Sequence, residues 1–245
     1  MKRLALLLAL CLAGCTAPGP ALPSPALSAP AGMPVIVTLG DSVPAGTACD
    51  CDPFPDLYAR RISPEARSVD LAQPGFTSAD VRGQVGAGAV QAALRNASVV
   101  LIMAGANDLA DAFDSGGDDG AYQASAAQVE TNVAAIVAAI AQIHGTPVSV
   151  LVLGYWNVVK DGAAALAAYG AAGLASAESA THYANQALRQ AADRTGARYV
   201  PTTPAFNGDE RDQDPTGLLA SDGDHPNAAG HQAIADALYA ALPAG

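Results

Sequence analysis

Positive charge and aromatic residues are both scarce in this sequence. The 245 residues include 12 lysines and arginines against 23 aspartates and glutamates, which gives a formal net charge of −11, and 5% are aromatic. Nucleic-acid binding through a basic surface is therefore not expected, because such a surface needs clustered positive charge. Apolar residues make up 51% of the chain and charged residues 14%, which predicts a folded domain with a full core. The length suits one α/β domain and is short for two.

Cysteine is also rare, and no pair of cysteines or histidines has the spacing of a metal site. Cys11 and Cys15 lie near the N-terminus, and Cys49 and Cys51 form a Cys-x-Cys pair. We expect this pair to close a small disulfide ring in an oxidising compartment, with two free thiols as the alternative. No second Cys or His pair accompanies it, so we expect no metal site.

The longest apolar run near the N-terminus, residues 4–13, is too short to span a bilayer as a stable helix. It follows Lys2 and Arg3, and this order is typical of an export signal. The run ends in Leu12-Ala13-Gly14-Cys15, which resembles a bacterial lipobox. We therefore predict a lipoprotein signal peptide over residues 1–14 and a lipidated Cys15.

This prediction places the protein in the cell envelope, exported and held by lipid at the outer face of a membrane. The alternative is an ordinary secretory signal cut near Ala17, which gives a soluble secreted protein. Residues 15–33 are then a lipid anchor with a linker rich in Pro, Ala and Ser. Fully extended, such a linker reaches about 55 Å. The folded domain is expected over residues 34–245, and its oligomeric state is not readable from the sequence.

Short β-rich runs alternate with longer alanine-rich amphipathic stretches after Pro34. Two of the runs, 99–103 and 148–153, are almost continuously apolar, which is typical of parallel strands covered by helices on both faces. The pattern predicts an α/β fold, a three-layer α/β/α sandwich with a five-stranded parallel sheet. Strands are expected at 35–39, 67–71, 98–103, 148–153 and 198–201. Helices are expected at 56–62, 79–94, 123–143, 163–195 (with breaks near Gly170 and Gly173) and 227–242.

Ser42 directly follows the first strand, in Gly40-Asp41-Ser42, and Asp222-Gly223-Asp224-His225 lies near the C-terminus. A serine hydroxyl is a poor nucleophile at neutral pH and needs a base, for which imidazole is well suited. Asp222 can accept the other ring N–H of His225 and fix its tautomer. We prefer Asp222 to Asp224, because a neighbour in sequence usually points away. The same segment is also typical of an Asx turn before a helix.

Two further residues follow strands at the edge where ligands bind in such sheets. Gly75 comes after the second strand, and Asn107 comes after the third. Acyl transfer passes through an oxyanion, which needs donors placed in advance. The backbone N–H groups of Ser42 and Gly75 and the side-chain amide of Asn107 are predicted to form this oxyanion hole.

These four blocks together resemble the SGNH hydrolase family, also known as GDSL esterases and lipases. In that family a serine, a glycine, an asparagine and an Asp-x-x-His form the site, and Ser42, Gly75, Asn107 and Asp222 with His225 occupy those positions in the same order. Val43 stands where the name-giving motif has leucine. The resemblance implies a flavodoxin-like fold, ester hydrolysis through an acyl-enzyme, and no metal or organic cofactor.

Two other families with related folds do not fit. Classical α/β-hydrolases carry their serine in Gly-x-Ser-x-Gly in mid-chain, unlike Gly40-Asp41-Ser42-Val43-Pro44. The glycines at 83, 86 and 88 lack the spacing of a dinucleotide-binding motif and lie in a helical stretch. The prediction is therefore a serine hydrolase of lipid, short acyl or O-acetyl glycan esters. The alternative is a non-catalytic envelope lipoprotein that uses the fold for binding.

Trp156 and Asn157 follow the fourth strand and are predicted to line the substrate pocket. The alternative for Trp156 is an aromatic side chain that only covers the end of the sheet. The alanine- and glycine-rich stretch 161–176 is either a lid or, as we prefer, a helical hairpin at the surface.

Overall fold

The structure is a computed structural model that describes residues 32–242. The predicted signal peptide (1–14), the lipidated Cys15 and the linker up to residue 31 lie outside the described residues. Five parallel strands form one sheet in the order β2-β1-β3-β4-β5, as predicted. The strands are β1 (Val35–Gly40), β2 (Arg67–Asp70), β3 (Val99–Met103), β4 (Ser149–Leu153) and β5 (Arg198–Val200).

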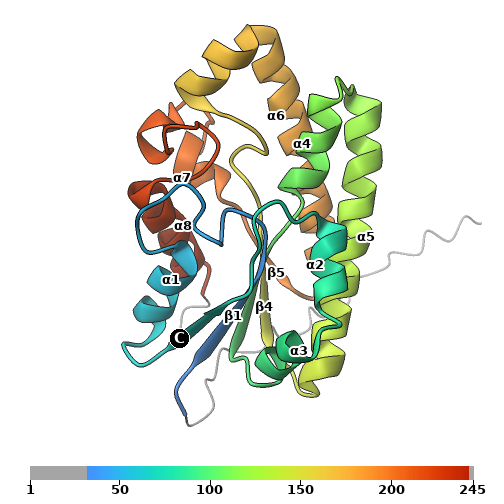
Figure 1. The fold of residues 1–245 in the computed structure, drawn as a ribbon, viewed down its shortest axis with the longest axis vertical. Helices are drawn as coiled ribbons and strands as arrows, with labels where there is room; N and C mark the ends of the chain where they lie inside the picture. The colour runs from blue at the N-terminus through green and yellow to red at the C-terminus, as the bar shows by residue number, and fades with distance from the viewer. Residues whose placement is uncertain (1–31, 243–245) are drawn as a thin grey trace, which may run out of the picture.

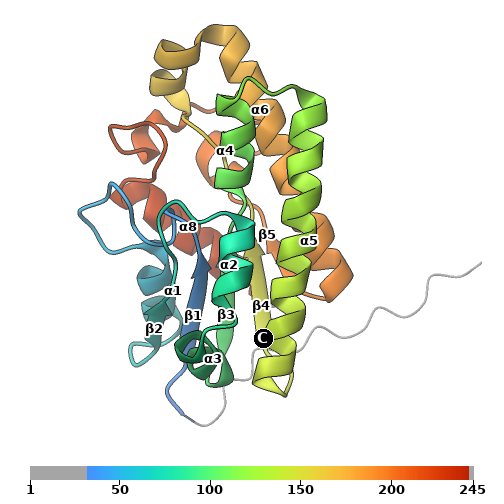
Figure 2. The same cartoon turned by 45° about the vertical axis from the view of Figure 1, so that its right-hand side comes forward.

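Helices cover both faces of the sheet, which gives the three layers that the sequence predicts (Figures 1 and 2). One face carries α1 (Phe54–Ile62), α7 (Thr203–Asn207) and α8 (Ala228–Ala240). The other carries α2 (Ser78–Gln84), α3 (Gly88–Arg95), α4 (Ala106–Asp114), α5 (Asp119–His144) and α6 (Gly162–Thr195). A short 3₁₀ helix, η1 (Pro215–Leu218), precedes α8.

The central strands explain why the core forms where it does. Every residue of β3 is buried, and β1 is buried from Ile36 to Gly40. Such strands cannot face water, so helices must cover them on both sides. Gly40 pairs with Met103 at the end of the sheet, and a Cβ at Gly40 would lie 2.2 Å from the Met103 carbonyl oxygen. Glycine is therefore required here for β1 and β3 to approach closely just before Ser42.

The helices differ from the prediction at several points. The helix expected at 79–94 is two helices, α2 and α3, because the chain turns between Val85 and Ala87. Helix α4, directly after Gly105, was not predicted. Helix α6 runs through 162–195 with one break, at Gly170, where φ is 63°, while Gly173 stays helical. The stretch 161–176 therefore includes the short first arm of α6, the break at Gly170 and the start of the second arm.

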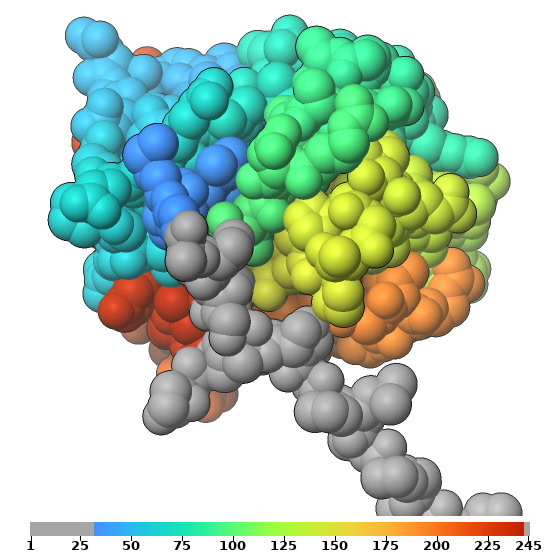
Figure 3. Space-filling model, turned by 90° about the horizontal axis from the view of Figure 1, so that it is seen from below, coloured from blue at the N-terminus to red at the C-terminus, as the bar shows by residue number. Residues whose placement is uncertain are grey.

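Helix α5 is the one described helix long and apolar enough to cross a membrane by length and composition. It packs against α6, α2 and α4 beside the sheet, as a core helix does. The described chain begins at the edge where the strands begin, and Figure 3 views the molecule from that edge. The strands end at the opposite edge, where the candidate residues follow β1, β2 and β3.

Candidate active site

Ser42 lies in a turn that begins where β1 ends. The Asp41 N–H donates to the Met103 carbonyl at 3.1 Å, which extends the pairing of β1 with β3 by one residue. The Thr47 N–H donates to the Ser42 carbonyl at 3.0 Å and closes the turn. Ser42 is half-buried, while Asp41 and Val43 on either side are buried. The fold therefore holds the serine at the carboxyl edge of the sheet between two fixed neighbours.

His225 and Asp222 are joined directly. His225 Nδ1 lies 2.8 Å from Asp222 Oδ2, whereas Asp224 Oδ2 is 4.0 Å from the same nitrogen. Because a carboxylate only accepts, Nδ1 carries the hydrogen, and Nε2 is left as the basic nitrogen. Burial raises the pKa of Asp222, but the N–H groups of Asp224 and His225 and the imidazole outweigh it, so this pKa lies below its usual value. Asp222 is thus suited to stay ionised beside the ring.

The Asp222–His225 segment is also the Asx turn considered above. Asp222 Oδ1 accepts the N–H groups of Asp224 at 3.0 Å and His225 at 3.1 Å. The two carboxylate oxygens of Asp222 therefore have different partners. Oδ1 accepts the hydrogen bonds of the turn, and Oδ2 accepts the hydrogen bond from the His225 ring. The next helix, α8, has its own cap, Asn227, whose Oδ1 accepts from Ala229 and Gly230.

A second segment fixes this turn from outside. Lys160 Nζ donates to the Asp222 carbonyl at 3.1 Å, and the Asp161 N–H donates to the Gly223 carbonyl at 2.7 Å. A Cβ at Gly223 would lie 2.2 Å from Ala164 Cβ, so α6 packs closely on the turn. The start of α6 therefore supports the residues that hold the imidazole.

Ser42 and His225 lie at the same edge, but no hydrogen bond joins Ser42 Oγ to the imidazole in residues 32–242. When protonated, His225 lowers the pKa of Asp41, the residue before Ser42. Hydrogen bonds between catalytic groups are often long without substrate and shorten in the complex. The predicted contact between Ser42 and His225 stays a prediction.

Sequence reasoning missed a buried pair beside Ser42. Tyr155 Oη donates to Asp41 Oδ2 at 2.5 Å, and the Val43 N–H donates to Asp41 Oδ1 at 3.0 Å. Complete burial raises the pKa of Asp41 to about 7, against the lowering effect of these hydrogen bonds. The position of Tyr155 directly after β4 gave a signal, since the end of this strand must face the same edge as Ser42.

Asn107, one of the predicted oxyanion donors, bonds to the chain beside Gly75, another of them. Asn107 Nδ2 donates to the Phe76 carbonyl at 2.8 Å, which ties the start of α4 to the residue after Gly75. This contact uses one amide hydrogen and leaves the other for a ligand. Gly75 is exposed and has φ of 81°, a left-handed conformation that glycine adopts at little cost. The loop and the amide therefore present donors at the carboxyl edge.

A buried polar network, also absent from the sequence prediction, supports this loop. Asp108 accepts the Ser78 N–H and the Ser78 hydroxyl, each at 2.7 Å, and Asn132 Nδ2 donates to Ser78 Oγ at 3.0 Å. Burial raises the pKa of Asp108, and the bonds from Ser78 oppose that rise. The network links α2, α4 and α5 behind Gly75 and Asn107.

The predicted substrate-lining residues are interior in this structure. Trp156 is 1% exposed and stacks on Phe206, with 3.9 Å between ring centroids. Asn157 is 4% exposed, and its Oδ1 accepts from the Thr181 hydroxyl at 2.9 Å. This geometry is that of the alternative, an aromatic side chain covering the end of the sheet. A contact between these residues and substrate stays a prediction.

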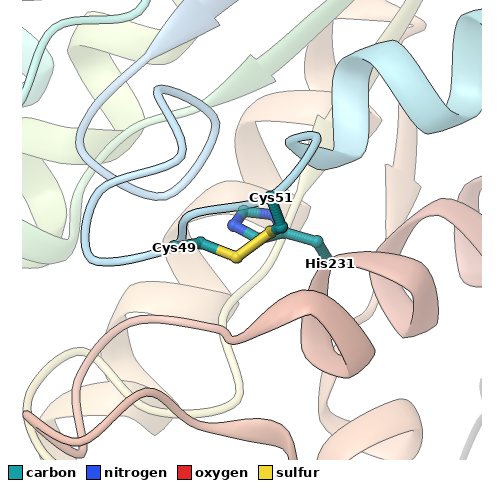
Figure 4. A group of neighbouring side chains, drawn as sticks. All are labelled: Cys49, Cys51 and His231. Carbon is teal, nitrogen blue, oxygen red and sulfur yellow. A yellow bond between two sulfur atoms is a disulfide. The ribbon is translucent and has the colours of Figure 1, made fainter.

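The Cys49–Cys51 pair is a disulfide in the loop between β1 and α1, and His231 of α8 lies beside it (Figure 4). The three side chains lie close enough to hold a metal ion, but their chemistry does not fit one. Both sulfurs are bonded to each other. His231 Nδ1 accepts from the Phe54 N–H at 3.2 Å, so Nε2 carries the ring hydrogen and offers no lone pair. Burial lowers the pKa of His231 to about 4, which keeps the ring neutral.

Comparison with known proteins agrees with the fold and the motifs. Residues 38–233 match the family model described as the GDSL-like Lipase/Acylhydrolase family. No curated protein sequence matches the chain.

Solved structures resemble the chain over most of its length. The lipase Lip_vut3 from a goat rumen metagenome has a TM-score of 0.68 at 18% identity, covering 85% of this chain and 97% of its own. An acetylxylan esterase, Axe2 from Geobacillus stearothermophilus, has a TM-score of 0.60 at 18% identity, with 86% and 95% covered. TesA has a TM-score of 0.57 at 18% identity, with 85% and 98% covered. At this sequence identity the likeness shows a shared fold alone.

Proposed function

The chain belongs to the GDSL-like lipase/acylhydrolase family, and we propose that it is a serine esterase that acts through an acyl-enzyme. The observation that carries this proposal is the 2.8 Å contact between His225 Nδ1 and Asp222 Oδ2 at the sheet edge where Ser42 follows β1. The esterase and lipase folds that resemble this chain support ester hydrolysis as the reaction class.

The proposed reaction has two stages. Ser42 Oγ attacks the ester carbonyl while His225 Nε2 takes its proton, and the same proton then goes to the leaving alcohol. Water attacks the resulting acyl-enzyme with His225 again as base, which releases the acid and restores Ser42. Asp222 keeps Nδ1 protonated and stabilises the imidazolium that forms in each stage. No metal or organic cofactor takes part in these steps.

Each tetrahedral intermediate carries its negative charge on the former carbonyl oxygen. The N–H groups of Ser42 and Gly75 and the free amide hydrogen of Asn107 are the proposed donors. The bond from Asn107 to Phe76 supports this role, because it fixes the amide before substrate binds. Donors that are already oriented stabilise the oxyanion without a cost of reorganisation.

The proposed substrates are carboxylic esters with a lipid, short acyl or O-acetyl glycan group. Lip_vut3 is a lipase and Axe2 an acetylxylan esterase, so folds of this type serve both ends of that range. We further propose that Cys15 is lipidated and that the linker holds the domain at the outer face of a membrane. The described chain starts at the edge opposite the candidate residues.

Hydrolysis of p-nitrophenyl esters from acetate to palmitate by the purified protein tests the proposal. We expect turnover on at least one chain length, and loss of roughly 10⁶-fold in kcat for Ser42→Ala. The matched control is Ser63→Ala, in the loop after α1, which should keep full activity. A folded protein with no turnover on any chain length contradicts the esterase and favours the binding lipoprotein.

A further inference from the structure

A polar cavity lies at the edge of the sheet, beside β5. Its volume is about 360 Å³, and its walls come from the second half of α6, the end of β5 and the turn after α7. None of the catalytic candidates lines it. The strands β3 and β4 lie between β1 and β5, and three strand spacings amount to about 14 Å. The cavity is therefore near the catalytic edge and separate from it.

Five polar side chains line this cavity without a hydrogen bond or ion pair to any residue in 32–242: His182, Gln186, Arg189, Asp209 and Arg211. The first three are at positions i, i+4 and i+7 of α6, so they form one face of the helix. Arg189 is held over the Tyr199 ring at 4.4 Å from its centroid, which orients its guanidinium. The helix therefore presents an ordered row of polar groups to the cavity.

Arg211 reaches the cavity from a strained turn. Its φ is 59°, and Ala48 is the other described non-glycine residue with positive φ. A left-handed conformation is costly for a long side chain, and residues held in one are concentrated at ligand-binding and active sites. The Arg211 N–H donates to the Gly208 carbonyl at 3.2 Å, which fixes this turn. The strain has no compensating ion pair within the described chain.

Both guanidinium groups act on the same partly buried phenol, that of Tyr199. Burial raises the pKa of Tyr199 to about 12, and the positive charges of Arg189 and Arg211 oppose this rise. Two like charges therefore face one cavity, in a protein whose net charge is −11. By contrast, Arg60, Arg61 and Arg194 each pair with a carboxylate. A ligand with a carboxylate would supply Arg189 and Arg211 with the ion pair that neither has within residues 32–242.

We propose that this cavity binds an acidic sugar, a uronate unit of a glycan. The two arginines bind its carboxylate, since a guanidinium matches a carboxylate with two parallel hydrogen bonds. Asp209 and Gln186 bind the sugar hydroxyls. A site for a simple anion would not need these two side chains. Any contribution of this site to catalysis rests on the proposed esterase function, which would then act on esters of acidic glycans.

Isothermal titration calorimetry with the full chain tests the binding, using tri-galacturonate, neutral tri-galactose and inorganic phosphate as probes. We expect the galacturonate to bind, with an affinity that falls when NaCl rises from 0.05 to 0.5 M, because salt screens exposed charges. Arg189→Gln and Arg211→Gln should each weaken it about tenfold. The matched control is Arg95→Gln at the exposed end of α3, which should bind as the wild type does.

The outcomes separate this proposal from the esterase. Ser42→Ala should bind the galacturonate unchanged, and Arg189→Gln should hydrolyse a small neutral ester at the wild-type rate. Equal binding of the neutral trisaccharide, or phosphate that binds as tightly as the galacturonate, overturns the acidic-sugar site. So does binding that survives the Arg189→Gln and Arg211→Gln double variant. None of these results bears on catalysis at Ser42.

Discussion

Tyr155 Oη donates a 2.5 Å hydrogen bond to Asp41 Oδ2, and so joins the end of β4 to the residue before Ser42. Both side chains are buried, with Tyr155 1% and Asp41 0% exposed. The other oxygen of Asp41 accepts from the Val43 N–H. The Asp41 carboxylate thus bonds to the residue after Ser42 and to Tyr155, which follows β4. Tyr155 is therefore a positioning residue for the proposed nucleophile.

Removal of this hydroxyl should loosen the nucleophile turn. Tyr155→Phe leaves Asp41 buried with one partner fewer, which should cost about 1–3 kcal/mol of unfolding free energy. We also expect a lower kcat with little change in KM, because the serine is displaced while the rest of the site is intact. Urea unfolding and ester kinetics measure both effects.

Tyr58→Phe is the matched control. Tyr58 is also buried, but its hydroxyl has no hydrogen-bond partner within the described residues. Its loss should therefore leave stability unchanged or raise it, and leave kcat unchanged. If both variants behave alike, the bond from Tyr155 to Asp41 does not position Ser42.

Asp41 should make stability depend on pH in an unusual direction. Its pKa is raised from 3.8 to about 7, so the folded state favours the protonated acid. This contribution is fully present below pH 3.8 and is lost as the pH rises towards 7, with a slope of up to about 1.4 kcal/mol per pH unit. Asp41→Asn lacks it.

The measurement is the difference in unfolding free energy between Asp41→Asn and the wild type at pH 4.5 and pH 8. The wild type should lose stability relative to the variant as the pH rises. Because His231 shifts stability with pH in both proteins, the difference isolates Asp41. A difference that is the same at both pH values would show that Asp41 has an ordinary pKa.

The two carboxylates near His225 should differ sharply in their effects. Asp222→Asn keeps Oδ1 for the turn and replaces the oxygen that accepts from Nδ1, so the ring loses its tautomer preference. We expect kcat to fall about 10⁴-fold. Asp224 Oδ2 lies 4.0 Å from His225 Nδ1, so Asp224→Asn should lower kcat much less. Equal losses in the two variants would mean that Asp222 is not the partner of the imidazole.

Asn107→Ala should lower kcat roughly 10²- to 10³-fold through loss of an oxyanion donor, with little effect on KM. Asn96→Ala is the control, since Asn96 follows the last residue of α3, before β3 rather than after it, and its side-chain amide donates to the Ala92 carbonyl. Ester kinetics of the two variants decide the point. A rise in KM with unchanged kcat would assign Asn107 to substrate binding instead.

The sequence was sufficient for the sheet, because buried parallel strands such as β3 are continuous apolar runs with clear ends. It was less informative about helices with weak patterns. Helix α4 starts at Ala106 directly after β3, so its first turn reads as part of the motif around Asn107. The break between α2 and α3 has no proline, and its glycines also occur within helices of this chain.

Ser42, Gly75 and Asn107 were found because each follows a strand, and the sheet brings the carboxyl ends together. Asp222 and His225 were found from their Asp-x-x-His spacing. The partners of those residues were not found, since they depend on side-chain packing. Tyr155 meets Asp41 across 114 positions of sequence, and Lys160 meets the Asp222 carbonyl across 62. The place of Tyr155 after β4 indicates the edge of the sheet where it lies, but hydropathy and spacing do not show which side chains pair there. For the same reason the burial of Trp156 could not be read from its place after β4.

The most direct test of the account is covalent labelling of the folded wild-type protein with a fluorophosphonate, followed by peptide mass spectrometry. The reagent reacts with a serine only when a neighbouring base activates it and donors stabilise the oxyanion. We predict one adduct, on Ser42, which is absent from His225→Ala and from heat-unfolded protein. No adduct in a folded sample, or an adduct on another serine, would contradict the claim that Ser42 and His225 work together.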